Sequence, residues 1–351
     1  MTDVQRRLSI FSVFFLTLIF IGFFQSWNVA LGIFNLCLIS ATMALGVNIQ
    51  LGYAGIFNAG VMGFAALGGL SAVLIAYPPV PETIKLGGKG VLLAFIILIV
   101  GAWLITFIYK SDQTKRFKKI IIPLIILILL VLFNFIGSPA IKKIEAFEPA
   151  ATGFLGGLGL PILFSWIVGG IFAGIVAYFI GKLTLGLRSD YLAIATLGIA
   201  EVIIYFLKNE NWLTRGVKNV NGLPRPVPYE VDLQGSKWFI EICERYNFPL
   251  VETSSIVVKM SYCLLFSGVL ITLFVLSEIA LKSPWGRMMR AIRDNEVSAK
   301  AMGKNVKARH LEIFIIGSAV VGLAGAMLTT LEGQFTPTTY QPLRFTFTVW
   351  V

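Results

Sequence analysis

The feature of this sequence that most limits its fold is a series of long apolar segments. An α-helix needs about 20 residues to cross the hydrocarbon core of a membrane, and each segment is close to that length. They cover residues 8–26, 29–49, 60–77, 91–109, 120–136, 159–181, 191–207, 256–281 and 311–331. The sequence therefore predicts an all-α polytopic membrane protein with about nine transmembrane helices, plus the start of a tenth near Leu343.

The composition excludes the main classes of soluble protein. Hydrophobic residues make up 57% of the 351 residues and charged residues 13%, whereas about 25% of a soluble domain is charged. No water-soluble fold can bury so much apolar surface, which excludes a soluble enzyme, a nucleic-acid-binding protein and a disordered chain. With one histidine, His310, and three widely spaced cysteines, we expect no metal site, bound cofactor or catalytic residues in this chain.

Loop charges predict the orientation in the membrane. Arg6 and Arg7 precede an apolar run without a good signal-peptide cleavage site, so we expect an uncleaved first helix with a cytoplasmic N-terminus. Every strongly basic loop then falls on the cytoplasmic side, as the positive-inside rule requires. The basic loops are 110–119, 182–190 and 282–310, and the balanced outside loops are 137–153 and 208–255.

We expect a single transmembrane domain over residues 1–351 with three distinct parts. Hairpin 91–136 is almost entirely Ile, Leu, Val and Phe, so it offers nothing for binding and is expected to face lipid. Loop 208–255 is too long for a simple connection and either docks an extracytoplasmic partner or caps the surface. Loop 282–310 holds eight basic and two acidic residues. Because the tenth apolar segment stops at Val351, the chain is expected to be C-terminally truncated.

A glycine-rich break separates the second and third apolar segments. Freed backbone groups near membrane depth are tolerated only where protein or a water-filled cavity satisfies them, and broken helices often line substrate paths in transporters. An ordinary cytoplasmic turn is the alternative. The candidate translocation-pathway residues in this break are Asn48, Gln50, Gly52, Tyr53, Gly55 and Asn58.

Glu201 places a carboxylate in the middle of the seventh apolar segment. That position costs about 2.5–3.5 kcal/mol on membrane-insertion scales, so the group is expected to face the bundle interior and to have a partner. It either makes a structural hydrogen bond between helices or takes part in the translocation pathway, to which we also assign Thr196.

Residues 284–303 predict an amphipathic helix beside the membrane. Ser283 followed by Pro284 is a good helix start, and Gly303 can end the helix. Such a helix can lie on anionic headgroups or fit the groove of a soluble partner, and the residues alone favour neither. The apolar face is Trp285, Met288, Met289, Ile292, Asn295, Ala299 and Met302, and the basic face is Arg287, Arg290 and Arg293.

Small residues at four-residue spacing mark two segments that can pack closely against other helices in lipid. Close packing is the simpler interpretation, and a moving or gating helix pair is the alternative. The residues are Gly170 and Gly174 in one segment and Ser318, Gly322 and Ala326 in the other.

The sequence contains no G-x-x-x-x-G-K-[ST] phosphate-binding loop. If ATP drives this protein, another chain therefore hydrolyses it. A proton relay would need a chain of buried Asp, Glu and His residues, and Glu201 stands alone.

Several motifs follow one another in a fixed order. Gly52-Tyr53-Ala54-Gly55 precedes a glycine-rich helix, and residues 187–198 read LRSDYLAIATLG, with Glu201 shortly after. Residues 283–303 read SPWGRMMRAIRDNEVSAKAMG, and residues 322–326 read GLAGA. Over roughly 29–77 and 159–351, this order and spacing resembles the branched-chain amino acid ABC transporter permeases of the LivM type.

The resemblance implies a non-catalytic permease subunit of an ATP-driven importer in a bacterial inner membrane. It implies a second homologous permease subunit, two cytoplasmic ATPase subunits that carry ATP and Mg²⁺, and a periplasmic substrate-binding protein facing loop 208–255. Nucleic acid has no part in such a system. It also places a coupling helix, seated in a groove of the ATPase, within 284–303. The ATPase-coupling residues would be Trp285, Arg287, Met288, Arg290, Ile292, Arg293, Asp294, Glu296 and Gly303.

The sequence departs from the family pattern at two places. The family often has Gln-Leu-Ser-Leu-Gly-His after Gly-Tyr-Ala-Gly, whereas residues 56–61 here read IFNAGV and lack the histidine. The resemblance therefore implies a cargo that is either a branched-chain amino acid or, if residues 56–61 touch the solute, a related one such as another amino acid, an amide or urea. Hairpin 91–136 looks like an insertion.

The alternative function is an ion-gradient-driven carrier or channel.

Overall fold

The computed structural model describes residues 1–351 except 1–2, 112–113, 149–151, 343–345, 347–348 and 351. Each of the nine predicted spans coincides with a helix, so the predicted all-α polytopic fold is confirmed. Among the described residues, seven helical segments are long and apolar enough to cross a membrane, and the apolar segments of α1 and α3 are shorter. The predicted tenth segment lies mostly outside the described residues. The long helices are α1 (Asp3–Phe24), α2 (Trp27–Ala54), α3 (Val61–Ala76), α5 (Lys89–Lys110), α6 (Lys115–Ala146), α7 (Ile162–Thr184), α8 (Ser189–Asn209), α12 (Leu250–Lys282) and α15 (Val306–Glu332).

Shorter elements connect these helices. Two strands, β1 (Val220–Asn221) and β2 (Gln334–Phe335), pair antiparallel with Val220 opposite Phe335. The short helices are α4 (Pro81–Thr83), the π-helix η1 (Ile84–Gly88), α9 (Asn211–Thr214), the 3-10 helix η2 (Gly216–Lys218), α10 (Glu230–Gly235), α11 (Lys237–Arg245), α13 (Pro284–Asp294), α14 (Glu296–Ala301) and the 3-10 helix η3 (Pro337–Tyr340).

The centre of the bundle is α3, in which nearly every residue is buried. Helix α15 packs against α2, α3 and α7, and α3 also packs against α7 and α8. Glycines allow this approach, since a Cβ atom at Gly68 would collide with the carbonyl oxygen of Gly322 and one at Gly325 with that of Ala65. Close backbone contact between small residues is the usual way in which helices associate in lipid.

Local sequence sets the ends of several helices. The Ser26 hydroxyl accepts the Asn28 N–H at 3.1 Å where α2 begins, and Pro284 takes the first position of α13. Gly55 ends α2 in the left-handed conformation with φ 70°, and Gly333 ends α15 with φ 65°. Glycine adopts positive φ without the steric cost that a Cβ brings.

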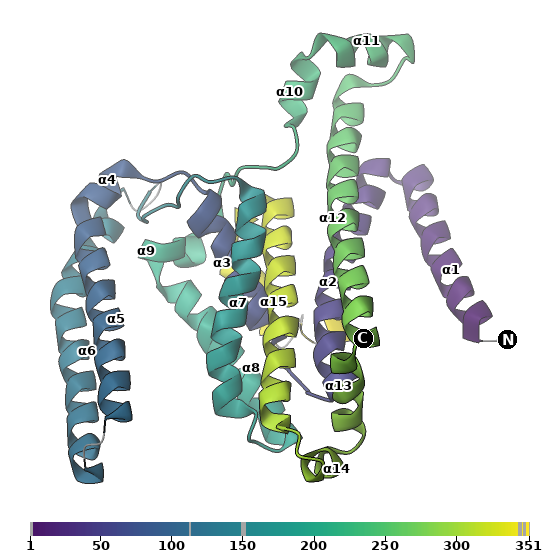
Figure 1. The fold of residues 1–351 in the computed structure, drawn as a ribbon. Helices are drawn as coiled ribbons and strands as arrows, with labels where there is room; N and C mark the ends of the chain where they lie inside the picture. Colours follow the sequence, from purple (N-terminus) through teal and green to yellow (C-terminus); the bar gives the residue numbers. More distant parts are fainter. Residues whose placement is uncertain (1–2, 112–113, 149–151, 343–345, 347–348, 351) are drawn as a thin grey trace.

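The basic loops share one end of the bundle. The ends of α5, α7 and α12, together with α13 and α14, lie at the lower end in Figure 1, whereas α4, α10 and α11 lie at the upper end. The strongly basic segments therefore gather on one side, in the arrangement that the loop charges predict.

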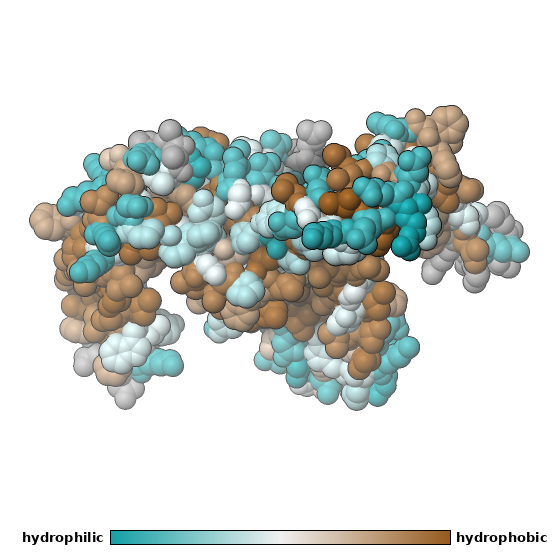
Figure 2. Space-filling model, turned by 90° about the horizontal axis from the view of Figure 1, so that it is seen from above, coloured by the Kyte–Doolittle hydropathy of each residue, from teal (hydrophilic) through white to brown (hydrophobic). Residues whose placement is uncertain are grey.

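Two parts stand away from the bundle. Helix α1 packs along α2, and the hairpin of α5 and α6 stands to the left of the bundle in Figure 1. Hydrophobic side chains cover much of the hairpin when the molecule is seen from above (Figure 2). Few residues of either hairpin helix are buried, as expected of helices whose surface faces lipid.

Two helices extend further than the hydropathy of the sequence indicates. Helix α6 runs to Ala146, through much of the predicted outside loop 137–153, and α12 begins at Leu250 rather than near residue 256. A helix can continue beyond the hydrocarbon core because its backbone hydrogen bonds are made within the segment. Loop 208–255 is also not a simple loop, since it contains α9, η2, β1, α10 and α11.

Candidate functional site

The break between α2 and α3 is closed by a buried network of polar side chains. Gln50 Nε2 donates to the Phe314 carbonyl and to Ser318 Oγ, each at 3.0 Å, and Gln50 Oε1 accepts from Asn58 Nδ2 at 2.9 Å. Asn58 Oδ1 accepts the Gly60 N–H at 2.9 Å. The network ties the non-helical residues 55–60 to α15, and it satisfies polar groups that would be costly to bury unpaired.

Helix α8 contacts the same break. Thr196 is buried, and its hydroxyl accepts the Ala59 N–H at 3.1 Å while donating to the Ala193 carbonyl at 3.0 Å. A Cβ atom at Gly60 would collide with the Thr196 carbonyl oxygen, so glycine is needed for this close approach. In this conformation, Gln50, Asn58 and Thr196 therefore join three helices inside the chain.

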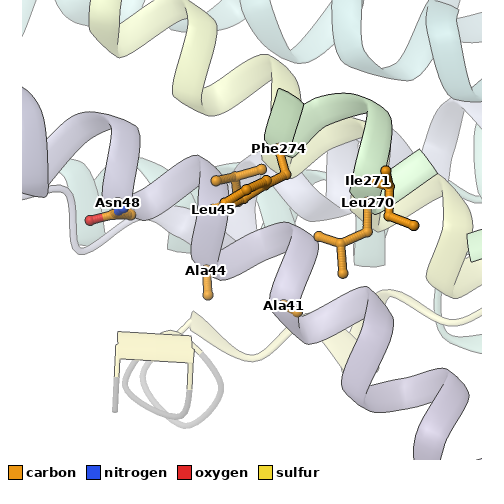
Figure 3. A pocket seen from close by; sticks show the side chains of 7 residues that line it. All are labelled: Ala41, Ala44, Leu45, Asn48, Leu270, Ile271 and Phe274. Atoms are coloured by element: carbon orange, nitrogen blue, oxygen red, sulfur yellow. The ribbon is translucent and has the colours of Figure 1, made fainter. Parts of the chain in front are cut away.

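Two of the candidate pathway residues lie on the surface instead. Asn48 is exposed on α2, at one end of an otherwise apolar groove of about 500 Å³ between α2 and α12 (Figure 3). Glu201 is exposed on α8, and among the described residues its carboxylate has no hydrogen-bond or salt-bridge partner. The expectation that Glu201 faces the bundle interior is therefore wrong for this single chain. Tyr53 and Gly52 are half-buried, and Gly55 is exposed.

Glu201 lies on an exposed face of α8. Gly198 and Tyr205 are exposed on this face, and an added Cβ at Gly198 would meet nothing within 4 Å. A carboxylate facing hydrocarbon is expensive, so this face needs water or polar groups from another chain.

Helix α13 packs one face onto its own bundle. Met289 and Ile292 are buried, with Ile292 only 2% exposed, and Met288 and Trp285 are half-buried. Ile292 is therefore not available as an apolar anchor for a partner, contrary to the prediction. The reason is that α13 packs against both α2 and α12, and its apolar stripe covers the ends of those helices.

Arg293 joins α13 to the break. Its Nη1 donates to the Gly52 carbonyl at 2.5 Å, while Nε and Nη2 contact Asp294 Oδ1 at 3.1 and 3.0 Å. Gly52 lies in the last turn of α2, next to the left-handed Gly55. The predicted coupling segment and the predicted pathway segment are thus in direct contact, although they are 241 residues apart.

The other two arginines are differently placed. Arg287 Nη1 donates to the Lys282 carbonyl at 3.2 Å, and Arg290 Nη2 donates to the Leu281 carbonyl at 3.4 Å. Both side chains are exposed. Because these contacts use only part of each guanidinium group, donors remain for a partner.

The predicted continuous helix 284–303 is in fact two helices. Asn295 is extended with φ −155°, and its side chain accepts the Ser298 N–H at 2.9 Å to begin α14. This turn interrupts the predicted apolar stripe, and Met302, one of its members, is 80% exposed. Glu296 contacts Lys300 at 2.8 Å, and this hydrogen bond lowers the pKa of the Glu296 carboxyl. Gly303 follows α14 with φ 75°.

One contact near α13 was not predicted from the sequence. Trp285 Nε1 donates to Glu312 Oε2 at 3.2 Å, and Glu312 also pairs with Arg309 at 2.7 Å. The three-residue spacing of Arg309 and Glu312 is a helix-pair signal that the sequence does contain. The pair orients the indole of Trp285 against α15.

Three of the small residues named from the sequence, Gly170, Gly174 and Gly322, lie where α7 and α15 approach each other. A Cβ at Gly170 would come within 3.1 Å of the Ala319 carbonyl oxygen, and one at Gly174 within 3.5 Å of Ala319 Cβ. A Cβ at Gly322 would collide with Ala173 Cβ, and Ala326 is fully buried. Ser318 belongs to the Gln50 network.

We expect replacement of Gln50 with leucine to destabilise the bundle. The change removes three hydrogen bonds and leaves Asn58 Nδ2 without its acceptor, at about 1–3 kcal/mol for each buried polar group left unpaired. Thermal unfolding of the detergent-purified chain measures this. The control is Asn48→Leu, an exposed position on the same helix. Equal melting temperatures for the two variants would contradict the structural role of the network.

The helical bundle, its polar break and the basic segment beside it define a multi-pass membrane protein. The sequence model of one family, described as branched-chain amino acid transport system / permease component, matches residues 147–351. This match covers more than half of the chain, and it includes α7, α8, α12, α13, α14 and α15. The chain belongs to this family.

Individual relatives agree with that assignment. The high-affinity branched-chain amino acid transport system permease protein LivM of Escherichia coli K12 is 27% identical over 177 residues, which are 49% of this chain and 41% of that protein. The probable branched-chain amino acid transport permease protein LivM of Methanocaldococcus jannaschii is 24% identical over 181 residues, 50% of this chain and 46% of that protein. The matches thus span less than half the length of these relatives. No solved structure matches the chain.

Proposed function

We propose that this chain is a membrane permease subunit of an ATP-driven importer for branched-chain amino acids or related small amino-acid-like solutes. The observation that carries the proposal is the contact of Arg293 with the Gly52 carbonyl, within a chain of the permease family. It links an exposed basic surface, suited to a soluble partner, to the buried break at the end of α2.

The proposal includes partner proteins, because this chain has no phosphate-binding loop with which to hydrolyse ATP. They are a second homologous permease, two cytoplasmic ATPase subunits with ATP and Mg²⁺, and a periplasmic substrate-binding protein. The basic end with α13 and α14 would face the cytoplasm of a bacterial cell, as would the N-terminus, and residues 208–255 would face the binding protein. This chain is then a non-catalytic subunit.

The proposed mechanism follows from the contacts that hold α13 against the bundle. When the ATPases close, they push the exposed face of α13, where Arg287 and Arg290 supply charge complementarity. Met289, Ile292 and Arg293 transmit that displacement to the end of α2 because they pack or bond against the bundle. The bundle then switches between two arrangements that open to opposite sides of the membrane.

Glu201 is assigned to the surface that meets the second permease, where solute would pass. An exposed carboxylate on α8 needs polar surroundings, and two facing permeases with water between them would provide these.

Affinity purification of the tagged chain from its own cell membrane tests the proposed complex. The expected result is co-purification of a protein containing a phosphate-binding loop, together with a second permease, identified by mass spectrometry. A chain that purifies alone under conditions that keep other membrane complexes intact would contradict the proposal.

We expect Glu201→Gln to retain complex assembly better than Glu201→Leu does. Glutamine keeps a polar group on the exposed face of α8, whereas leucine removes it. The yield of assembled complex and the rate of uptake measure the effect, and Val202→Leu, also on the exposed side of α8, is the control. Equal assembly and uptake for glutamate, glutamine and leucine would remove any functional role for this residue.

A further inference from the structure

In the described part of the chain, the hairpin of α5 and α6 is attached to the bundle near one end. At that end, Thr83 Oγ1 donates to the Phe154 carbonyl at 2.9 Å, and the Trp212 N–H donates to Glu145 at 3.3 Å. Towards the opposite end the hairpin stands apart from α8 (Figure 1). Its two helices pack mainly against each other.

An apolar cleft of about 860 Å³ lies next to this attachment. One wall is the first turns of α5, with Leu92 and Phe95, and the other is formed by the end of α3, residues 155–158 and α9. Leu92 and Leu158 are largely exposed. Among the described residues that line the cleft, Lys89 alone is charged.

The spacing of charges on α5 places the cleft at a definite depth. Lys89 and Lys110 bound the helix and are 21 residues apart, a rise of about 32 Å. The hydrocarbon core is about 30 Å thick, so one lysine lies at each headgroup boundary. Because the residues between them are apolar, the cleft runs from the headgroup level at Lys89 into the hydrocarbon core.

Lys89 is available for a ligand. Its side chain is exposed, and among the described residues it makes no hydrogen bond or salt bridge. An unpaired ammonium group at headgroup level, above an apolar cleft, matches one class of molecule in charge and shape. That class is a lipid with a negative headgroup and a flexible acyl chain.

We infer that this cleft binds an anionic phospholipid, with its phosphate on Lys89 Nζ and an acyl chain between α5 and residues 155–158. The lipid covers the apolar walls that the hairpin and the bundle present to this open cleft. The hairpin thereby gains a second attachment to the bundle. This inference does not depend on the proposed transport function.

Native mass spectrometry of the full chain, purified with phosphatidylglycerol and phosphatidylethanolamine in equal amounts, tests the headgroup contact. The wild-type chain is expected to retain phosphatidylglycerol preferentially. Lys89→Gln should lower that preference about five-fold, the effect of one lysine near an anionic lipid. The control is Lys110→Gln at the other end of α5, which should leave the preference unchanged. Equal behaviour of the two variants would overturn the inference.

A second pair of variants tests the acyl-chain contact. Leu92→Trp fills the cleft and should reduce retention of both lipids, whereas Leu130→Trp on α6, outside the cleft, should not; the two leucines are 62% and 60% exposed. Elution volume in size-exclusion chromatography checks that both variants fold. Undiminished lipid retention by Leu92→Trp, or a polypeptide that co-purifies in place of lipid, would refute the site.

Discussion

Replacing Gly68 with alanine is expected to prevent the chain from accumulating as a folded protein. A Cβ atom at this position would collide with the carbonyl oxygen of Gly322, in the middle of α15. The obstacle is backbone, so no side-chain rotation relieves it, and α3 and α15 must move apart. Overpacking costs about 1–3 kcal/mol where side chains can adjust, and we expect at least the upper value here. Fluorescence-detected size-exclusion chromatography after stepwise heating measures the loss.

Two glycines elsewhere provide matched controls for this prediction. A Cβ atom at Gly198 on α8 or at Gly268 on α12 would meet nothing within 4 Å. Alanine at either position should therefore leave the unfolding temperature unchanged or raise it slightly, since alanine favours the helix. If Gly68→Ala is as stable as these two variants, α3 and α15 do not approach each other as described.

Reversing the charge of both Arg287 and Arg290 should abolish binding of the ATPase subunits. These guanidinium groups are exposed, and their contacts within the chain are single bonds to backbone carbonyls. A partner that complements two positive charges would then face two negative ones, and such juxtaposition costs several kcal/mol. We expect affinity to fall at least about 100-fold. Quantitative co-purification of the ATPase with Arg287→Glu/Arg290→Glu is the measurement.

The control for this double variant also reverses two positive charges at the same end of the molecule, but outside α13 and α14. Lys110→Glu/Lys119→Glu alters the hairpin, which contributes nothing to the α13–α14 segment. The ATPase should co-purify with this variant as it does with the unaltered chain. A similar loss in both variants would mean that overall charge, and not the face of α13, holds the ATPase.

The nine spans were predictable because hydropathy and length determine them directly. Each predicted segment falls on a helix, and the errors lie at the ends, as in α6 and α12. Apolar residues end where the hydrocarbon core ends, whereas helical hydrogen bonding does not. Hydropathy therefore locates a span and not the full helix.

The turn between α13 and α14 results from two conflicting signals at Asn295, apolar periodicity and helix capping. Asn295 lies at an apolar-stripe position, but its side chain also accepts a backbone N–H three residues later. Asparagine followed by an acidic residue is a helix-start signal. That signal prevailed over the apolar periodicity, which is why Met302 is exposed.

The surroundings of Glu201 and Arg293 could not be predicted from local patterns. Whether Glu201 faces inwards depends on which face of α8 its neighbours cover, and α3 and α7 cover the other side. Arg293 reaches Gly52 across 241 residues. Periodicity places both side chains on helix faces but does not say what those faces meet.

Uptake of the radiolabelled solute that the partner binding protein retains, leucine or a related one, into proteoliposomes tests the central claim most directly. The purified complex is reconstituted with its binding protein outside and ATP trapped inside, on the side of α13 and α14. The account predicts uptake that requires internal ATP and persists when ionophores remove all ion gradients. Uptake that proceeds without ATP and stops with the ionophores would contradict it, and would identify a carrier driven by ion gradients.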